Sequence, residues 1–222
     1  MPLTAAYDAY ADWYEDYVSG KAAPYTRRSG ELLADLLGPG TGPCLDLCCG
    51  TGVRARTIGA LGWTPLGVDL SRGQLRHAAA RLPAANGDAA ALPVATASLP
   101  AVACVLAHTD LPDYAAVVRE VARVLRPGGR FVHVGVHPCF VGAFADWSDR
   151  PRVHVDERYA DHSYTTEAWD QTGVRARVGA WHVPLADLLN AVTAAGLRLV
   201  RAAETGPGGV ADVLGLLAVK PA

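Results

Sequence analysis

The sequence predicts an α/β fold in which a mostly parallel sheet is covered by helices on both faces. Short apolar segments with strand character alternate along the chain with segments of helical period. The chain has 222 residues, of which 50% are hydrophobic and 19% are charged, so it can bury one large core. No internal repeat or Ser/Gly-rich linker divides it. We therefore expect a single domain over residues 1–222.

Six segments are expected to be strands because they are short, apolar and bounded by turn residues. In parallel sheets covered by helices, ligands bind at the edge where the strands have their carboxyl ends. The residues that follow these strands are therefore the first place to look for a site. The expected strands are 43–47, 63–69, 101–107, 130–136, 197–203 and 213–219.

Helical patterns separate most of these strands. Ser71, three residues before Gln74, forms a capping-box pattern that opens a helix directly after the strand at 63–69. Two further helices are expected at 111–125 and after Pro184, because proline is favoured in the first turn of a helix. Alternation of this kind is typical of strands joined by crossover helices.

Composition restricts the partners. The N-terminus has no basic region followed by an apolar stretch, and no apolar run reaches membrane-spanning length. A net charge of -2 with dispersed arginines argues against nucleic acid. The five cysteines are odd in number and match no common zinc spacing. We expect a cytoplasmic monomer or homodimer with reduced thiols, no metal, no membrane or nucleic-acid partner, and a small-molecule substrate.

A glycine-rich loop follows the first expected strand, and from Asp46 to Gly52 its sequence is D-L-C-C-G-T-G. Glycine permits a tight turn that brings backbone amides close to a ligand. The pattern Gly50-x-Gly52-x-x-Ala55 also fits the NAD fingerprint, and Asp69 follows near the distance of the ribose-binding acid. The loop alone therefore leaves two nucleotide cofactors open.

Four segments together resemble the class I S-adenosylmethionine-dependent methyltransferases. Residues 45–52 resemble motif I of that family, 67–71 its second-strand motif, 87–89 its adenine-binding segment, and 125–130 its turn before strand five. The resemblance implies a Rossmann-like fold with a seven-stranded, mostly parallel sheet. It also implies S-adenosylmethionine as the cofactor and S-adenosylhomocysteine as the product.

The resemblance also implies which residues hold the cofactor. The glycine loop would hold the methionine end, Asp69 the ribose hydroxyls, and residues 87–89 and Leu70 the adenine. The family most often has glycine where this chain has Cys48, so the backbone there must accept a side chain. The implied cofactor-binding residues are Tyr14, Asp46, Cys48, Gly50, Gly52, Asp69, Leu70, Asp88, Ala89 and Ala107.

Two regions outside these motifs are expected to cover the site. Helices within residues 1–40 resemble the cofactor-capping helix of small-molecule members of the family; the alternative is an amphipathic helix packed on the domain. Residues 138–183, after the fifth strand, are too long for a simple connection, and we expect a lid over the acceptor. A small separate core or a dimer contact is the alternative. The aromatic residues of this insertion include Phe140, Phe144, Trp147, Tyr159, Tyr164, Trp169 and Trp181.

Three histidines are candidates for a catalytic base or an acceptor anchor. His108 follows the strand at 101–107, His137 follows the strand at 130–136, and His182 precedes a helix. Imidazole titrates near neutral pH and can take a proton from an acceptor that must lose one. A helix cap or a turn residue is the alternative role for each of them.

The expected reaction is methyl transfer from S-adenosylmethionine to an O, N or C nucleophile of a small metabolite, with an aromatic secondary metabolite as one candidate. The methyl group of a sulfonium is already electrophilic, so the protein mainly has to align the acceptor and exclude water. One alternative is a same-fold enzyme that catalyses a non-methylating reaction such as cyclisation. Another is a non-catalytic cofactor-binding or interaction protein.

Overall fold

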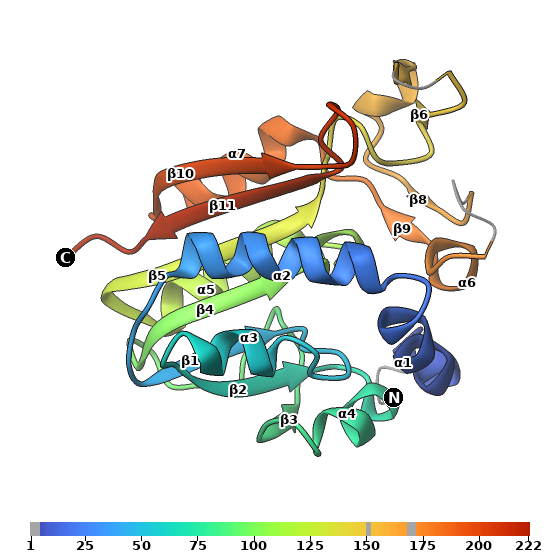
Figure 1. Ribbon diagram of the computed structural model, residues 1–222. Helices are drawn as coiled ribbons and strands as arrows, with labels where there is room; N and C mark the ends of the chain where they lie inside the picture. The colour runs from blue at the N-terminus through green and yellow to red at the C-terminus, as the bar shows by residue number, and fades with distance from the viewer. Residues whose placement is uncertain (1–4, 150–151, 168–171) are drawn as a thin grey trace.

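A computed structural model describes residues 5–149, 152–167 and 172–222. It contains a seven-stranded sheet with the order β10-β11-β5-β4-β1-β2-β3 (Figure 1). β1 to β5 run parallel, and β11 lies antiparallel to both of its neighbours. The predicted Rossmann-like fold is confirmed. The strands are β1 (Pro43–Leu47), β2 (Thr64–Asp69), β3 (Ala84–Asn86), β4 (Leu99–Val105), β5 (Leu125–Val136), β10 (Arg198–Thr205) and β11 (Val213–Val219).

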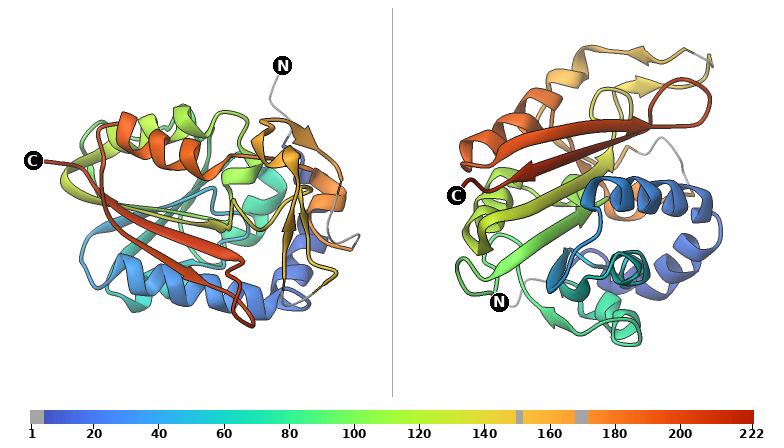
Figure 2. Two further views of the ribbon diagram at one scale, coloured as in Figure 1. Left: turned by 90° about the horizontal axis from the view of Figure 1, so that it is seen from above. Right: turned by 60° about the vertical axis from the view of Figure 1, so that its left-hand side comes forward.

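Helices cover both faces of the sheet, as Figures 1 and 2 show. α2 (Ala23–Leu37) and α3 (Ala55–Ala60) pack on one face, and α5 (Tyr114–Val124) and α7 (Leu185–Ala194) pack on the other. α1 (Ala11–Ser19) lies beyond the carboxyl ends of the central strands, next to α4 (Arg72–Ala78).

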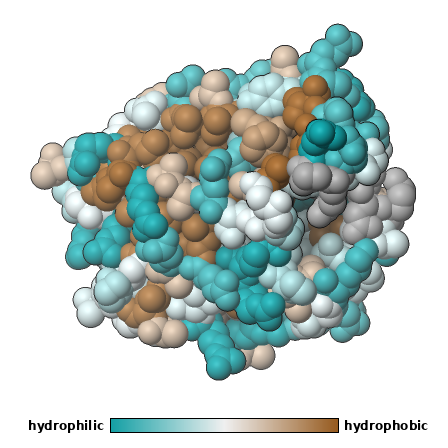
Figure 3. Space-filling view, turned by 45° about the horizontal axis from the view of Figure 1, so that its top comes forward, coloured by the Kyte–Doolittle hydropathy of each residue, from teal (hydrophilic) through white to brown (hydrophobic). Residues whose placement is uncertain are grey.

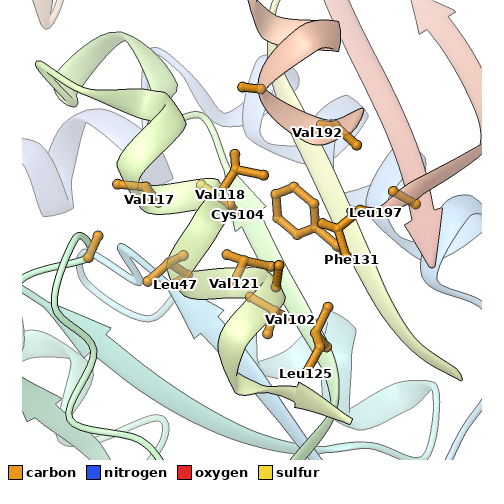
Figure 4. Packing of buried hydrophobic residues seen from close by; sticks show 14 of the residues in the cluster. Leu47, Val102, Cys104, Val117, Val118, Val121, Leu125, Phe131, Val192 and Leu197 are labelled. Carbon is orange, nitrogen blue, oxygen red and sulfur yellow. The ribbon is translucent and has the colours of Figure 1, made fainter. Parts of the chain in front are cut away.

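The two faces of the sheet have separate cores because successive residues of a strand point to opposite faces. On one face, Val118 and Val121 of α5 pack near Val102 and Phe131 of the sheet (Figure 4). On the other face, Leu33 of α2 is fully buried. Six of the seven residues of β4 are buried, as expected for a central parallel strand covered on both sides.

Element ends differ from prediction around β4. The strand stops at Val105 rather than continuing through residue 107, because Leu106 has a φ of 59° and turns the chain out of the sheet. A short 3-10 turn, η2 (His108–Asp110), follows. Asp113 then caps α5 by accepting a hydrogen bond from the Ala116 amide at 2.8 Å, so the prediction of a helix start at 111 was wrong.

The described residues of the segment 138–183 form short elements at the same end of the sheet as α1 (Figure 1). They make two small antiparallel ladders, and Arg177 stacks on the ring of Trp13 in α1 at 3.8 Å. Trp169, predicted in this segment, lies outside the described residues. The elements are β6 (Ala145–Asp146), β7 (His154–Val155), η3 (Glu157–Ala160), β8 (Tyr164–Thr165), α6 (Arg175–Val178) and β9 (Ala180–Trp181).

The outer face near β10 is unusually apolar. Figure 3 shows a broad band of hydrophobic residues on this side of the molecule. β10 is an edge strand, and its Leu199 and Val200 are 36% and 47% exposed. Within the described residues, no helix combines the length and the apolar character that a membrane crossing requires.

Candidate functional site

A cavity of about 970 Å³ lies where β1, β4 and β5 end. Its wall includes the glycine loop, α1, the start of α2, and residues 141–148 and 173–175. A volume of this size lies at the upper end of the range typical of small-molecule sites. The glycine loop and parts of both regions expected to cover it therefore face one space.

Asp46 in β1 presents a buried carboxylate to this cavity. The residue is 1% exposed, and its Oδ2 atom has no hydrogen-bond partner among the described residues. Burial raises the pKa of the carboxyl to about 7, although the nearby Arg54 guanidinium opposes the rise. A buried, unpaired carboxylate oxygen suits a ligand with an ammonium group. The α-amino group of S-adenosylmethionine is such a group.

Arg54 supplies the opposite charge beside Asp46. It is 7% exposed, lines the cavity, and donates to the Thr26 carbonyl and to Ser29 Oγ. These two bonds fix the guanidinium near the glycine loop. Asp46 and Arg54 together therefore match an amino-acid zwitterion, which is the end of the cofactor that the loop was predicted to hold.

The raised pKa of Asp46 predicts a pH-dependent penalty on folding. Because the folded-state pKa lies above the usual 3.8, the folded state binds more protons between about pH 4 and pH 7, and stability falls as the pH rises through that window. Asp46→Asn should raise the melting temperature of the ligand-free protein, and by more at about pH 8 than at about pH 5. Asp35→Asn, at an exposed ion pair with Arg201, is the control. An equal rise in the melting temperature of Asp46→Asn at both pH values would contradict this account.

Cys48 occupies a backbone conformation that favours glycine. Its φ is 56°, and it occupies the position where the related motif most often has glycine. The left-handed region costs an L-residue about 1–2 kcal/mol. The cysteine at a position that usually has glycine therefore has a strained backbone, and it lies on the cavity wall. Strained residues are common at functional sites.

Two substitutions at Cys48 separate backbone strain from lost packing. Both Cys48→Gly and Cys48→Ala remove the thiol, but only the glycine relieves the positive φ. The glycine variant should be more stable than the alanine variant by about 1 kcal/mol. Urea unfolding of the two proteins measures the difference. An alanine variant as stable as the glycine variant would show that the backbone there is unstrained.

Asp69, at the end of β2, fastens the glycine loop. Its carboxylate accepts hydrogen bonds from the Gly50 amide at 2.8 Å and from the Ser71 amide at 2.7 Å. Burial raises its pKa, and these two bonds oppose the rise. Asp69 does not itself line the large cavity. Its predicted contact with the ribose stays a prediction.

The predicted cofactor residues divide into two groups. Tyr14, Asp46, Cys48 and Gly50 line the cavity. The others lie outside its wall; among them Leu70 is 37% exposed, whereas Ala89 and Ala107 are each 5% exposed. Their roles toward the adenosine half stay predictions. This second group is Gly52, Asp69, Leu70, Asp88, Ala89 and Ala107.

The structure does not bring His108 to the large cavity. Since the chain turns at Leu106, His108 is directed into the core, where it is 1% exposed and its ring lies 5.0 Å from that of His133. Burial lowers the pKa of His108 well below its usual value, which keeps the ring neutral. His133, within β5, is a core histidine whose Nδ1 atom contacts Tyr114 Oη at 2.7 Å.

His137 and His182 also lie outside the wall of the large cavity. His137 is 3% exposed, and its Nε2 pairs with Glu204 at 2.7 Å. His182 Nε2 contacts the Tyr159 carbonyl at 2.8 Å, and with His108 it lines only a side cavity of about 20 Å³. None of the three candidate histidines therefore lines the large cavity, and their catalytic roles stay predictions.

A charged cluster that sequence reasoning missed lies on the cavity wall. Arg175 of α6 donates to Asp110 after β4 and to the Gly179 carbonyl, and the Tyr7 hydroxyl donates to Asp110 at 3.2 Å. The ring of Tyr7 meets that of Tyr14 edge-on at 5.4 Å. No local signal marks this cluster, because its members come from three distant parts of the chain.

Comparisons with known proteins agree with this architecture. A family model described as a methyltransferase domain matches residues 44–129. A demethylmenaquinone methyltransferase from Mycolicibacterium vanbaalenii is 40% identical over 89 residues, which span 40% of this chain and 39% of that relative. The match thus covers about two fifths of the length of this curated relative.

Solved structures match over more of the chain. An S-adenosylmethionine-dependent methyltransferase from Mesorhizobium loti aligns with 87% of this chain and 96% of its own, with 24% identity and a TM-score of 0.68. The cyclase SpnF aligns with 88% of this chain and 82% of its own, with 18% identity and a TM-score of 0.64. These likenesses show the fold. The family model and the glycine loop add that residues 44–129 are similar to an S-adenosylmethionine-dependent methyltransferase domain.

Proposed function

We propose that this chain transfers a methyl group from S-adenosylmethionine to a nucleophile on a small planar metabolite. The supporting observation is one cavity that joins the unpaired carboxylate of Asp46 to a wall with six aromatic side chains. The bound cofactor would supply an electrophilic methyl group. The aromatic residues of that wall are Tyr7, Tyr14, Tyr17, Tyr25, Phe144 and Trp147.

In this proposal each part of the wall has a separate task. Asp46 accepts hydrogen bonds from the amino group of the cofactor, and Arg54 attracts its carboxylate. The glycine loop offers backbone amides, and Tyr14 packs beside the loop near Gly50. The helices within residues 1–40 and the lid within residues 138–183 exclude water from the reacting atoms.

A flat acceptor suits this wall because aromatic rings stack and orient planar substrates. The name of the curated relatives, demethylmenaquinone methyltransferase, gives a ring-containing molecule as their acceptor. The three candidate histidines lie outside the wall of the large cavity, and the histidine that does line it, His154, has a side chain that is 62% exposed and lies 3.5 Å from Asp149. We therefore propose an acceptor that reacts without losing a proton to an imidazole, such as an activated ring carbon or an already ionised oxygen.

The experiment is incubation of the purified chain with methyl-labelled S-adenosylmethionine and a panel of hydroxylated aromatic acids, phenols and quinols. We expect label in one class of product and an equal yield of S-adenosylhomocysteine. Cofactor binding with consumption of a panel member but without label transfer would favour a same-fold enzyme such as a cyclase. Cofactor binding with no consumption of any panel member would favour the non-catalytic alternative.

A further inference from the structure

Arg175 is a buried cation at the wall of the large cavity. It is 9% exposed, and it belongs to α6 in the segment over the carboxyl ends of the strands. Its Nη1 atom donates to Asp110 and to the Gly179 carbonyl. These two bonds hold the guanidinium in one orientation, with one carboxylate as its partner.

The guanidinium has further donors that these bonds do not use. Arginine has five N–H groups, and among the described residues Nε and Nη2 of Arg175 have no hydrogen-bond partner. Neither atom is sealed from accessible space. Unused donors on a largely buried cation favour a ligand with oxygen acceptors, because a guanidinium edge matches a carboxylate or a similar oxyanion.

The amino-acid end of the cofactor has its own charged partners elsewhere on the wall. Asp46 and Arg54 lie together at the glycine loop, where they match the ammonium and carboxylate groups of a zwitterion. Arg175 comes from a different segment and pairs with Asp110 after β4. Arg175 is therefore available to bind the second molecule in the cavity, the methyl acceptor.

We propose that Arg175 binds a negatively charged oxygen on the acceptor, so that the acceptor class is a planar aromatic acid or ionised phenol. The proposal rests on the proposed function, since it names the acceptor of the same site. Asp110 and Tyr7 position the guanidinium, and Tyr14 lies beside Tyr7 at the wall. A cation at this place stabilises an oxygen that is already ionised, which agrees with a wall whose described histidine, His154, is largely exposed.

Two probes of matched shape test the charge requirement. 2-Naphthoate and 2-naphthamide differ in charge but are nearly equal in size and planarity. Calorimetric titration into protein saturated with S-adenosylhomocysteine should give at least tenfold tighter binding of the naphthoate. Arg175→Gln should remove this difference and leave the affinity for S-adenosylhomocysteine within about twofold.

Arg158→Gln is the matched control. Arg158 also lines the cavity, but it is more exposed and already pairs with Asp156 and Glu167. This variant should keep the preference for naphthoate. If Arg158→Gln lost the preference as fully as Arg175→Gln, the cavity would attract anions only in a general way, and the assignment to Arg175 would be overturned.

Other outcomes are equally decisive. Equal affinity of the wild-type protein for the two probes overturns the proposal even if Arg175→Gln fails to fold. If Arg175→Gln weakens S-adenosylhomocysteine but not 5′-methylthioadenosine, which lacks the amino-acid end, Arg175 holds the cofactor and the proposal fails while the proposed function stands. If the wild-type protein binds no S-adenosylhomocysteine, the proposed function fails, and naphthoate binding to the ligand-free protein still tests Arg175.

Discussion

Replacing Asp69 with alanine should weaken S-adenosylhomocysteine binding by at least tenfold, or about 1.4 kcal/mol. The carboxylate holds the Gly50 and Ser71 amides at 2.8 and 2.7 Å, and hydrogen bonds to charged groups contribute about 1.5–3 kcal/mol each. Loss of these two hydrogen bonds releases the glycine loop from the end of β2. Any hydrogen bond from Asp69 to the ribose would be lost as well. Isothermal titration calorimetry measures the change.

Asp69→Asn is the control for that substitution. The amide keeps the shape of the side chain, but it has one acceptor oxygen and no charge, so it can keep one of the two backbone bonds. Its affinity should lie between those of the wild type and Asp69→Ala. If both variants bound S-adenosylhomocysteine as tightly as the wild type, Asp69 would have no part in the cofactor site.

Replacing Gly52 with alanine should lower the free energy of unfolding by roughly 2–5 kcal/mol. Gly52 has a φ of 78°, and an added Cβ atom would lie 2.5 Å from Leu82 Cδ2 and 3.2 Å from Ala78 Cα. The substitution therefore combines backbone strain with overpacking where the loop meets α4. Denaturant unfolding measures the loss.

Gly128→Ala separates these two causes. Gly128 has a φ of 74°, close to that of Gly52, but an added Cβ atom would meet nothing within 4 Å. It should lose only about 1–2 kcal/mol, the part that comes from strain. Equal losses at the two positions would mean that Leu82 moves aside without penalty and that close packing does not require Gly52.

The sheet could be predicted because its central strands are short, apolar and separated by capped helices. All six predicted strands are present, two with the predicted bounds and four with shifted ends, and the capping hydrogen bond between Gln74 N and Ser71 Oγ is confirmed at 3.1 Å. β3 (Ala84–Asn86) was missed because it has three residues, all exposed, and therefore no apolar pattern.

The site was harder to predict because it depends on two features without a local signal. Leucine rarely has a positive φ, so nothing in the sequence indicates that Leu106 turns His108 into the core. Arg175 and Asp110 are 65 residues apart, and a single sequence does not show that they pair. The glycine loop could be identified from the sequence because its chemistry is contained in seven consecutive residues.

The central claim is that the glycine loop serves S-adenosylmethionine rather than a nicotinamide cofactor. Calorimetric titration of the purified chain with S-adenosylmethionine and, separately, with NAD tests it most directly. We expect one S-adenosylmethionine to bind per chain, and NAD to bind at least a hundredfold more weakly, a difference of about 2.7 kcal/mol. Tighter binding of NAD, or no binding of S-adenosylmethionine, would contradict the account.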